Sequence, residues 1–218
     1  MVRMSVAFVL ACFLTAWSPA QPDFETRFSW RKDTSRGLLE FYAVELNSNG
    51  NGQFCFKKRN EDEIKLPVTL RTSAIETLSA LFQKANFLDE SRDFVSQRKV
   101  ADMGSKTIRL ESGSKQREVV YNYTEDRALQ EITNFFENLS QQERALFELD
   151  LALKYDRLGI PKKLDELDRN LNANRIIAPE RFAPVLEKIY ADRTLMNLAR
   201  KDAKKLLGRI EKMKPSAN

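Results

Sequence analysis

The sequence predicts an α+β protein, with an antiparallel sheet of five or six strands, a helix on one face and a C-terminal all-helical subdomain. Three patterns lead to this prediction. Hydrophobic and polar residues alternate repeatedly in the first half of the chain, as in strands covered on one face. Turn-forming residues separate these runs. In the second half, hydrophobic residues recur every three or four positions, as in amphipathic helices.

The first 20 residues have the pattern of a cleaved secretory signal peptide. Arg3 precedes a hydrophobic run, and the segment ends in the small residues Ser18-Pro19-Ala20. The run is shorter than the roughly 20 residues of a membrane-spanning helix. Cleavage after Ala20 predicts an exported protein, periplasmic or extracellular. A minor alternative is a lipid anchor on Cys12, because residues 9–12 resemble a weak bacterial lipoprotein box.

The segment 21–139 is expected to form the sheet domain. Strands are predicted over 24–30, 38–46, 54–56 and 64–70, and an asparagine- and glycine-rich turn separates the second strand from the third. Pro67 favours an edge position for the fourth strand, because proline has no N–H to pair. Ser73 and Glu76 predict a capping box at the start of a helix that runs to about Ala85.

Residues 106–138 predict a hairpin followed by a helix, and the rest of the sheet domain is organised around them. The turn of the hairpin is Ser112-Gly113-Ser114. Thr124 is expected to cap the helix, with acidic residues in its first turn. The hydrophobic positions of this helix lie three or four residues apart: Leu129, Ile132, Phe136 and Leu139.

The segment 140–218 is expected to form the helical subdomain. The predicted helix starts are Ser140, Pro161, Pro179 and Asp192. Ser140 and Glu143 form a second predicted capping box, and Leu158-Gly159 ends that helix. The last helix is expected to run to about Met213. The tail from Pro215 is expected to be disordered.

The charge distribution indicates no nucleic-acid partner. The net charge is +5, and most of the excess lies in residues 200–214, where seven Lys or Arg face two acidic residues. The rest of the chain is nearly neutral, so the high isoelectric point alone does not indicate that the protein binds nucleic acid.

The absence of histidine excludes Ser-His and Cys-His catalysis and most zinc or iron sites. After signal cleavage Cys55 is the only cysteine, and its strand-like surroundings favour a small packed side chain over a reactive thiol. No cofactor is predicted.

Two further motifs are incomplete matches to known functional patterns. Residues 96–99 and 112–115 match Ser-x-x-Lys, but neither opens a helix as that chemistry requires. Residues 168–174 carry oxygen-bearing side chains at alternate positions, as a calcium loop does, but Ala173 replaces the required glycine. A polar helix end is the preferred interpretation of that segment. No catalytic residue and no metal ligand is nominated.

The final predicted helix carries the clearest candidate surface for a partner or membrane. Its basic face consists of Lys201, Lys204, Lys205, Arg209 and Lys212. Such a face can bind an acidic partner or an anionic membrane. The preferred interpretation is that the apolar face of the helix packs on its neighbours and the lysines remain solvated.

Several segments together resemble uncharacterised secreted α+β proteins of environmental bacteria. The resemblance is carried by residues 101–110, by residues 117–124, by the helix with Phe135-Phe136 and by residues 178–182, which read Ala-Pro-Glu-Arg-Phe. It implies export and a sheet packed by helices. It implies no particular activity.

These observations favour an exported, non-enzymatic binding or interaction protein, with a protein partner or an anionic surface as its target. Two alternatives stay open. One is a hydrolase that uses carboxylates or a Ser-Lys pair. The other is a peripheral membrane protein held by the basic C-terminal helix.

Overall fold

The structure is a computed structural model that describes residues 25–213, where six strands form one antiparallel sheet. The strands are β1 (Arg27–Asp33), β2 (Leu39–Asn47), β3 (Asn51–Lys58), β4 (Ile64–Thr69), β5 (Ser105–Ser112) and β6 (Lys115–Tyr121). Their order in the sheet is β4-β3-β2-β1-β5-β6, so Pro67 lies in an edge strand as predicted. The predicted signal peptide, the Cys12 anchor and the tail from Pro215 lie outside the described residues.

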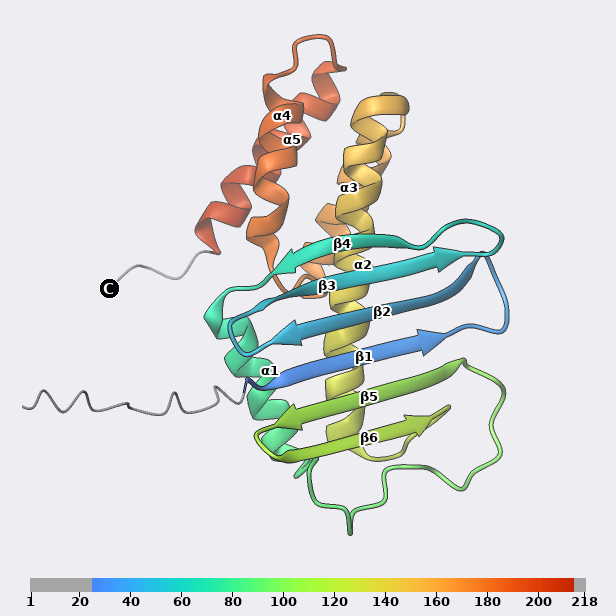
Figure 1. Cartoon of the computed structure of the whole chain (residues 1–218). Coiled ribbons are helices and arrows are strands. Elements are labelled where there is room, and N and C mark those ends of the chain that lie inside the picture. Colours follow the sequence, from blue (N-terminus) through green and yellow to red (C-terminus); the bar gives the residue numbers. More distant parts are fainter. Residues whose placement is uncertain (1–24, 214–218) are drawn as a thin grey trace, which may run out of the picture.

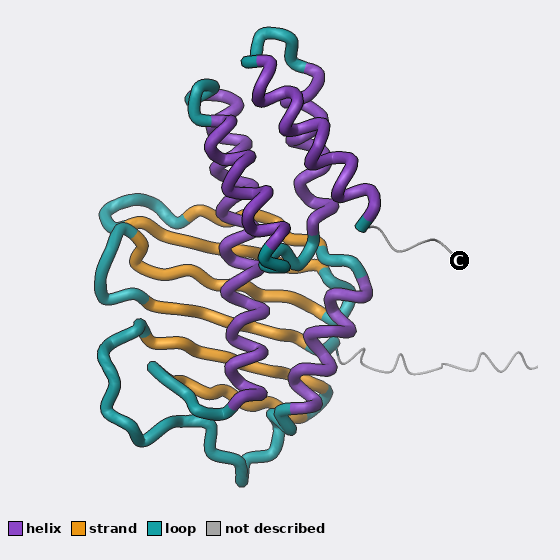
Figure 2. Tube along the Cα trace, turned by 180° about the vertical axis from the view of Figure 1, so that it is seen from behind, coloured by secondary structure: helices purple, strands orange, loops and turns teal. Residues whose placement is uncertain are grey.

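One face of the sheet forms the core because alternate strand residues point toward two helices. The register aligns one row of side chains that are at most 1% exposed: Ile108, Trp30, Val44 and Phe54. Helices α1 (Thr72–Lys84) and α2 (Arg127–Tyr155) cover this face, as Figure 2 shows. The Trp30 ring stacks on Phe136 of α2, with centroids 6.0 Å apart. The predicted fold class, a sheet with helical cover on one face, is confirmed.

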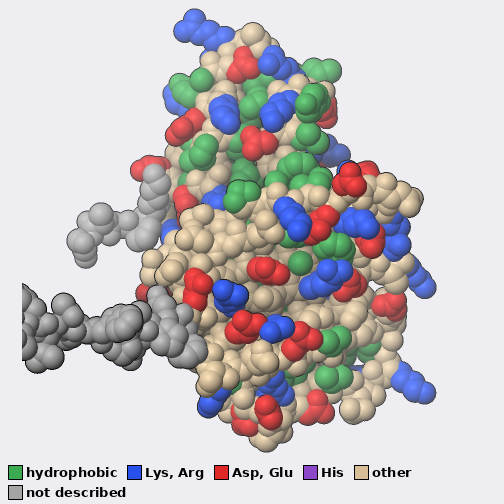
Figure 3. All heavy atoms as spheres, in the orientation of Figure 1, with side chains coloured by type: hydrophobic (Ala, Val, Ile, Leu, Met, Phe, Trp, Pro, Cys, Tyr) green, Lys and Arg blue, Asp and Glu red, His purple; other side chains and the backbone are tan. Residues whose placement is uncertain are grey.

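The opposite face of the sheet is open and polar. Figure 3 views this face and shows acidic and basic side chains mixed across the strands. The arrangement follows from the register, which places Arg109 between Glu118 of β6 and Ser29 of β1. Cys55 also lies on this face, where burial raises the pKa of its thiol to about 11. The thiol is therefore largely protonated at neutral pH.

The C-terminal part is helical and projects beyond the β4 edge of the sheet, as Figure 1 shows. It comprises the end of α2, α3 (Ile160–Asn172), the 3₁₀ helix η1 (Pro179–Phe182), α4 (Ala183–Ala191) and α5 (Asn197–Lys212). A second hydrophobic cluster holds these helices together. One buried leucine from each α-helix illustrates it: Leu149, Leu164, Leu186 and Leu206.

The predicted helix start at Ser140 is wrong, because α2 is a single helix of 29 residues that passes through this position. The Ser140 hydroxyl is buried and has no hydrogen-bond partner among the described residues. The Ser-x-x-Glu pattern caps a helix only where the serine backbone is extended. Here hydrophobic residues continue the helical stripe on both sides, so the backbone stays helical.

Three other predicted caps are also corrected. α1 begins at Thr72, before Ser73, and its N-cap residue makes no side-chain hydrogen bond. Asp126, not Thr124, caps α2 by accepting a hydrogen bond from the Leu129 N–H at 2.9 Å. Asp192 accepts a hydrogen bond from the Thr194 N–H in a turn, and α5 begins only at Asn197. Local capping motifs therefore located the helices but misplaced their first residues.

Candidate functional site

The five basic residues predicted to form a partner-binding or membrane-binding surface lie on α5. Three of them contact other residues of the same molecule. Lys205 Nζ lies 2.9 Å from a carboxylate oxygen of Asp168 in α3, and Arg209 pairs with the same carboxylate. Lys204 Nζ lies 5.5 Å from the centroid of the Tyr190 ring. Lys201 and Lys212 are exposed. Much of this basic face therefore helps to hold α5 against α3 and α4, and its role in binding a partner remains a prediction.

The weaker motifs show no catalytic arrangement in the described part of the chain. The Ser96 hydroxyl lies 3.3 Å from Glu125, and the Ser112 hydroxyl lies 3.3 Å from that of Thr26. Asp168, the first residue of the calcium-like segment, lies within α3 and pairs with cations of α5. A polar helix end is thus the correct interpretation of that segment. Residues 25–213 contain no group of three His, Cys, Asp or Glu side chains placed to hold a metal ion.

None of the helices in residues 25–213 is both long enough and apolar enough to cross a membrane.

A pocket of about 280 Å³ lies between the sheet and α2, where β1 ends and β5 begins. The segment that joins α1 to β5 closes one side of it with Met103. The other lining residues come from β1, β5, β6, the β6–α2 connection and α2: Lys32, Lys106, Tyr121, Asn122, Tyr123, Thr124, Gln130, Thr133, Asn134 and Glu137.

Two lysines lie side by side on the helix-covered face at this pocket. Lys32 of β1 is the register partner of Lys106 of β5. Lys32 Nζ lies 2.8 Å from Glu137 Oε1 of α2. Burial alone would lower the pKa of Lys32, but the hydrogen bond and the charge of Glu137 outweigh this effect and raise it. Lys32 and Glu137 therefore form a charge-compensated pair.

Lys106 differs, because it is a buried cation without an acidic partner. The residue is 7% exposed, and its Nζ donates to the backbone oxygens of Asn122 at 2.9 Å and Gly104 at 3.5 Å. Within residues 25–213 no carboxylate forms an ion pair with it. Burial lowers the pKa of Lys106, and the neighbouring charge of Lys32 lowers it further. The charges of Glu137 and Asp102 oppose this lowering in part, but neither carboxylate forms an ion pair with Lys106, whereas buried charges are normally paired.

Aromatic side chains form the wall beside this cation. Lys106 Nζ lies 5.7 Å from the centroid of the Tyr121 ring. The Tyr121 hydroxyl is hydrogen-bonded to Thr133 of α2, and burial raises the pKa of this phenol. Tyr121 is therefore neutral in the physiological range. The pocket combines two ammonium groups, one carboxylate and a neutral aromatic wall.

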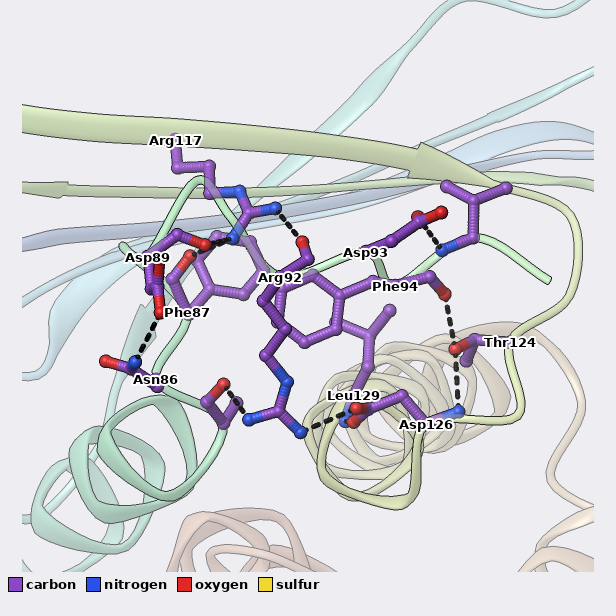
Figure 4. A network of polar contacts seen from close by, with 12 residues as sticks. Asn86, Phe87, Asp89, Arg92, Asp93, Phe94, Arg117, Thr124, Asp126 and Leu129 are labelled. Atoms are coloured by element: carbon purple, nitrogen blue, oxygen red, sulfur yellow. Dashed lines mark hydrogen bonds and ion pairs between the residues drawn. The ribbon is translucent and has the colours of Figure 1, made fainter.

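A network of polar contacts beside the pocket fixes the connection between α1 and β5 (Figure 4). Arg117 of β6 donates to the backbone oxygen of Phe87 at 3.0 Å and also to those of Asp89 and Arg92. Its guanidinium carbon lies 4.9 Å from the centroid of the Phe94 ring.

The same network orients the start of α2, which forms part of the pocket. The Thr124 hydroxyl donates to the backbone oxygen of Phe94 at 2.6 Å and accepts from the Asp126 N–H at 3.1 Å. Arg92 donates to the Asp126 carboxylate at 2.6 Å. Since Thr124 also lines the pocket, these contacts hold one pocket wall in place.

The pocket residues were missed in the sequence, although a signal was present. Lys32 extends the alternation of Phe28 and Trp30, and Lys106 extends that of Ile108 and Leu110. Continuing each alternation by one step places a lysine on the covered face. A lysine at such a position is rare without a partner, so it marks a candidate site.

The fold and the pocket define a class of protein: a two-layer α+β domain with an open pocket between its layers that holds two lysines. Residues 27–143 match the family described as a domain of unknown function, DUF6438, and the chain belongs to this family. No curated protein matches the chain. The matched part contains Lys32, Lys106 and Glu137, whereas α3, α4 and α5 lie outside it.

Proposed function

We propose that this protein is an exported, non-enzymatic binding protein whose pocket takes a small molecule with a carboxylate or phosphate group. The N-terminal signal pattern and the resemblance to secreted proteins of environmental bacteria support export. The binding role rests on the pocket at Lys32 and Lys106.

The observation that carries the proposal is the unpaired Lys106. Lys106 is 7% exposed as a residue, so burial weakens the hydration of its ammonium group, and two backbone oxygens replace only part of that hydration. Lys32 adds a second positive charge that Glu137 compensates. An anion beside Lys106 would supply the missing charge and form charge-assisted hydrogen bonds, which are stronger than neutral ones.

The dimensions of the pocket restrict the ligand to a small molecule. A volume of about 280 Å³ lies just below the range of roughly 300–1,000 Å³ typical of ligand sites. Tyr121 and Met103 provide apolar surface, and the exposed Asn134 stands at the rim. The ligand expected from this arrangement is a small organic acid or phosphate ester with a short, partly apolar body.

Binding is favoured over hydrolysis because the lysine lacks a nucleophilic partner. The Thr133 hydroxyl is engaged by Tyr121 and by the backbone oxygen of Leu129 at 2.7 Å. Glu137 is engaged by Lys32. These groups are already hydrogen-bonded, which favours fixed recognition of a ligand over proton transfer.

A thermal-shift screen tests the proposal with acetate, benzoate, inorganic phosphate and the uncharged control benzamide. A ligand at 100 times its Kd stabilises the folded state by about 2.7 kcal/mol, which raises the Tm of a chain of this size by roughly 5–10 °C. We expect this shift from an anion in wild-type protein and in Lys65→Met, an exposed strand lysine. The shift should be lost in Lys106→Met. An equal shift in all three proteins would refute the proposal.

A further inference from the structure

The two helical hairpins of the C-terminal part end side by side. The turn between α2 and α3 contains Arg157, whose Nη1 donates to the Thr194 hydroxyl at 2.6 Å in the turn between α4 and α5. Arg157 also pairs with Asp192 at 3.4 Å. Figure 1 shows both turns at the end of the molecule farthest from the β6 edge. We call residues 151–162 and 190–201 together the helical tip.

The helical tip exposes an unusual amount of hydrophobic surface. Leu158 is 81% exposed and Tyr155 is 80% exposed, both on the α2–α3 side. Further exposed hydrophobic residues of the tip are Leu151, Tyr190, Met196 and Leu198. In Figure 3, hydrophobic side chains gather over the helical end of the molecule, among basic and acidic ones. A concentration of exposed hydrophobic side chains of this kind marks a contact surface.

The charge of the helical tip indicates what it contacts. Residues 151–162 and 190–201 together hold six Lys or Arg and two Asp, a net charge of +4. One of these cations, Arg200, is partly buried and donates to the backbone oxygen of Tyr190 at 3.2 Å. Its two acidic residues both serve the turns: Asp156 accepts from the Gly159 N–H at 3.1 Å, and Asp192 pairs with Arg157. Besides Arg157, which is engaged by Asp192 and Thr194, the exposed cations of the tip are Lys154, Lys162, Arg193 and Lys201.

We propose that the helical tip docks on an anionic membrane surface, with Tyr155 and Leu158 in the interfacial layer and the exposed lysines against lipid headgroups. Tyrosine is favoured at the membrane–water interface, and basic residues are attracted to anionic lipids. A second copy of this chain is disfavoured, because two tips of the same charge repel each other. The shape agrees, since two adjacent turns form a projection rather than a groove.

This docking differs from a membrane contact along the whole basic face of α5. Lys205 and Arg209 are held by Asp168, so they are not free to meet lipid. Lys201, at the start of α5, belongs to the helical tip and is exposed. The proposal does not depend on the pocket, because no residue that lines the pocket belongs to the helical tip.

Vesicle co-sedimentation tests this inference with the mature chain expected from cleavage after Ala20. The vesicles contain phosphatidylglycerol with phosphatidylcholine, or phosphatidylcholine alone. We expect binding to the anionic vesicles only, with release at about 0.5 M NaCl because salt screens the headgroups. Leu158→Asp should weaken binding about tenfold or more, because it places a charge in the interfacial layer. Its matched control is Leu38→Asp, at a position 82% exposed in the β1–β2 connection.

A charge-reversal pair completes the test. Lys154→Glu with Lys162→Glu should abolish binding, whereas Lys99→Glu with Lys115→Glu should retain it, and circular dichroism should show that all variants are folded. The inference is overturned if wild-type protein stays in the supernatant with anionic vesicles. It is also overturned if the variants of the tip bind as well as their controls. Capture of an acidic protein without vesicle binding would assign the tip to a protein partner instead.

Discussion

Arg181 of η1 donates two hydrogen bonds to the carboxylate of Glu143 in α2, each 2.8 Å long. The Glu143 side chain is 1% exposed. Arg181 also donates to the backbone oxygens of Thr69 at 3.2 Å and Pro67 at 3.1 Å, both in the edge strand β4. One guanidinium group therefore joins the helical part, the long helix α2 and the sheet.

Removing one partner of this pair is expected to be strongly destabilising. Glu143→Ala leaves the partly buried Arg181 guanidinium, 18% exposed, without its carboxylate partner, and breaking a buried pair in this way reduces the free energy of unfolding by about 3–5 kcal/mol. Urea unfolding monitored by circular dichroism measures this. Asp165→Ala is the control, because the Asp165–Arg169 pair is exposed and should contribute no more than about 0.5 kcal/mol. A loss below about 1 kcal/mol for Glu143→Ala would show that the pair does not hold the two parts together.

Arg117 is expected to hold the connection between α1 and β5. Arg117→Ala removes the donor to three backbone oxygens, at Phe87, Asp89 and Arg92, and should reduce the free energy of unfolding by about 2–4 kcal/mol. Hydrogen exchange should become faster in residues 86–96.

Arg98→Ala is a matched control for Arg117→Ala in the same connection. The Arg98 side chain is 71% exposed and pairs with Glu125 at 2.9 Å, so its loss should change the free energy of unfolding by less than about 1 kcal/mol. Equal effects of the two substitutions would contradict a specific role for Arg117.

The fold could be predicted from the sequence because each strand has one covered and one open face. Phe28 and Trp30 in β1, or Ile108 and Leu110 in β5, show this alternation directly. The continuity of α2 could not be predicted from the local motif at Ser140, since only the packing of two hydrophobic clusters on one helix decides it.

The candidate site could be predicted only in part. The extended alternation places Lys32 and Lys106 on the covered face, but their adjacency depends on the pairing of β1 with β5, which are more than 70 residues apart in the chain. The partner of Lys32 is Glu137, on a helix that follows both strands. Neither relationship has a local sequence signal, so the pocket emerged only from the three-dimensional arrangement.

Acid should weaken the cap of α2. Burial would raise the pKa of Asp126, but hydrogen bonds from the Leu129 N–H and from Arg92 lower it below its ordinary value of 3.8. Its contribution to stability is therefore fully present above that value and is lost as the pH falls through the lower folded-state pKa. Asp126→Asn should reduce the free energy of unfolding by about 1–2 kcal/mol near neutral pH.

The difference in free energy of unfolding between wild-type protein and Asp126→Asn should shrink as the pH falls below the ordinary value of 3.8 and through the lowered pKa of Asp126, because protonation then removes the same charge from the wild type. Urea unfolding over a series of pH values measures it. A difference that stays constant across this range would contradict the assigned role of the Asp126 charge.

Alkaline pH should relieve the unpaired charge of Lys106. The pKa of Lys106 is lowered in the folded state by burial and by Lys32, with partial opposition from Glu137 and Asp102. The unfolded chain therefore binds more protons between the lowered pKa and the ordinary value of 10.5, and stability contributed by this group rises with pH in that window. The free energy of unfolding of Lys106→Met relative to that of wild type should be highest at neutral pH and should decline as the pH approaches 10.5. Urea unfolding at a series of pH values measures this difference, and a difference that does not change with pH would contradict the account.

Isothermal titration calorimetry of the most stabilising anion tests the central claim most directly. We predict one binding site per wild-type chain, retained in Lys65→Met, and an affinity at least about tenfold weaker in Lys106→Met, because the ligand loses a charge-assisted contact. Folded Lys106→Met protein that binds the anion with wild-type affinity would show that Lys106 is not the ligand contact.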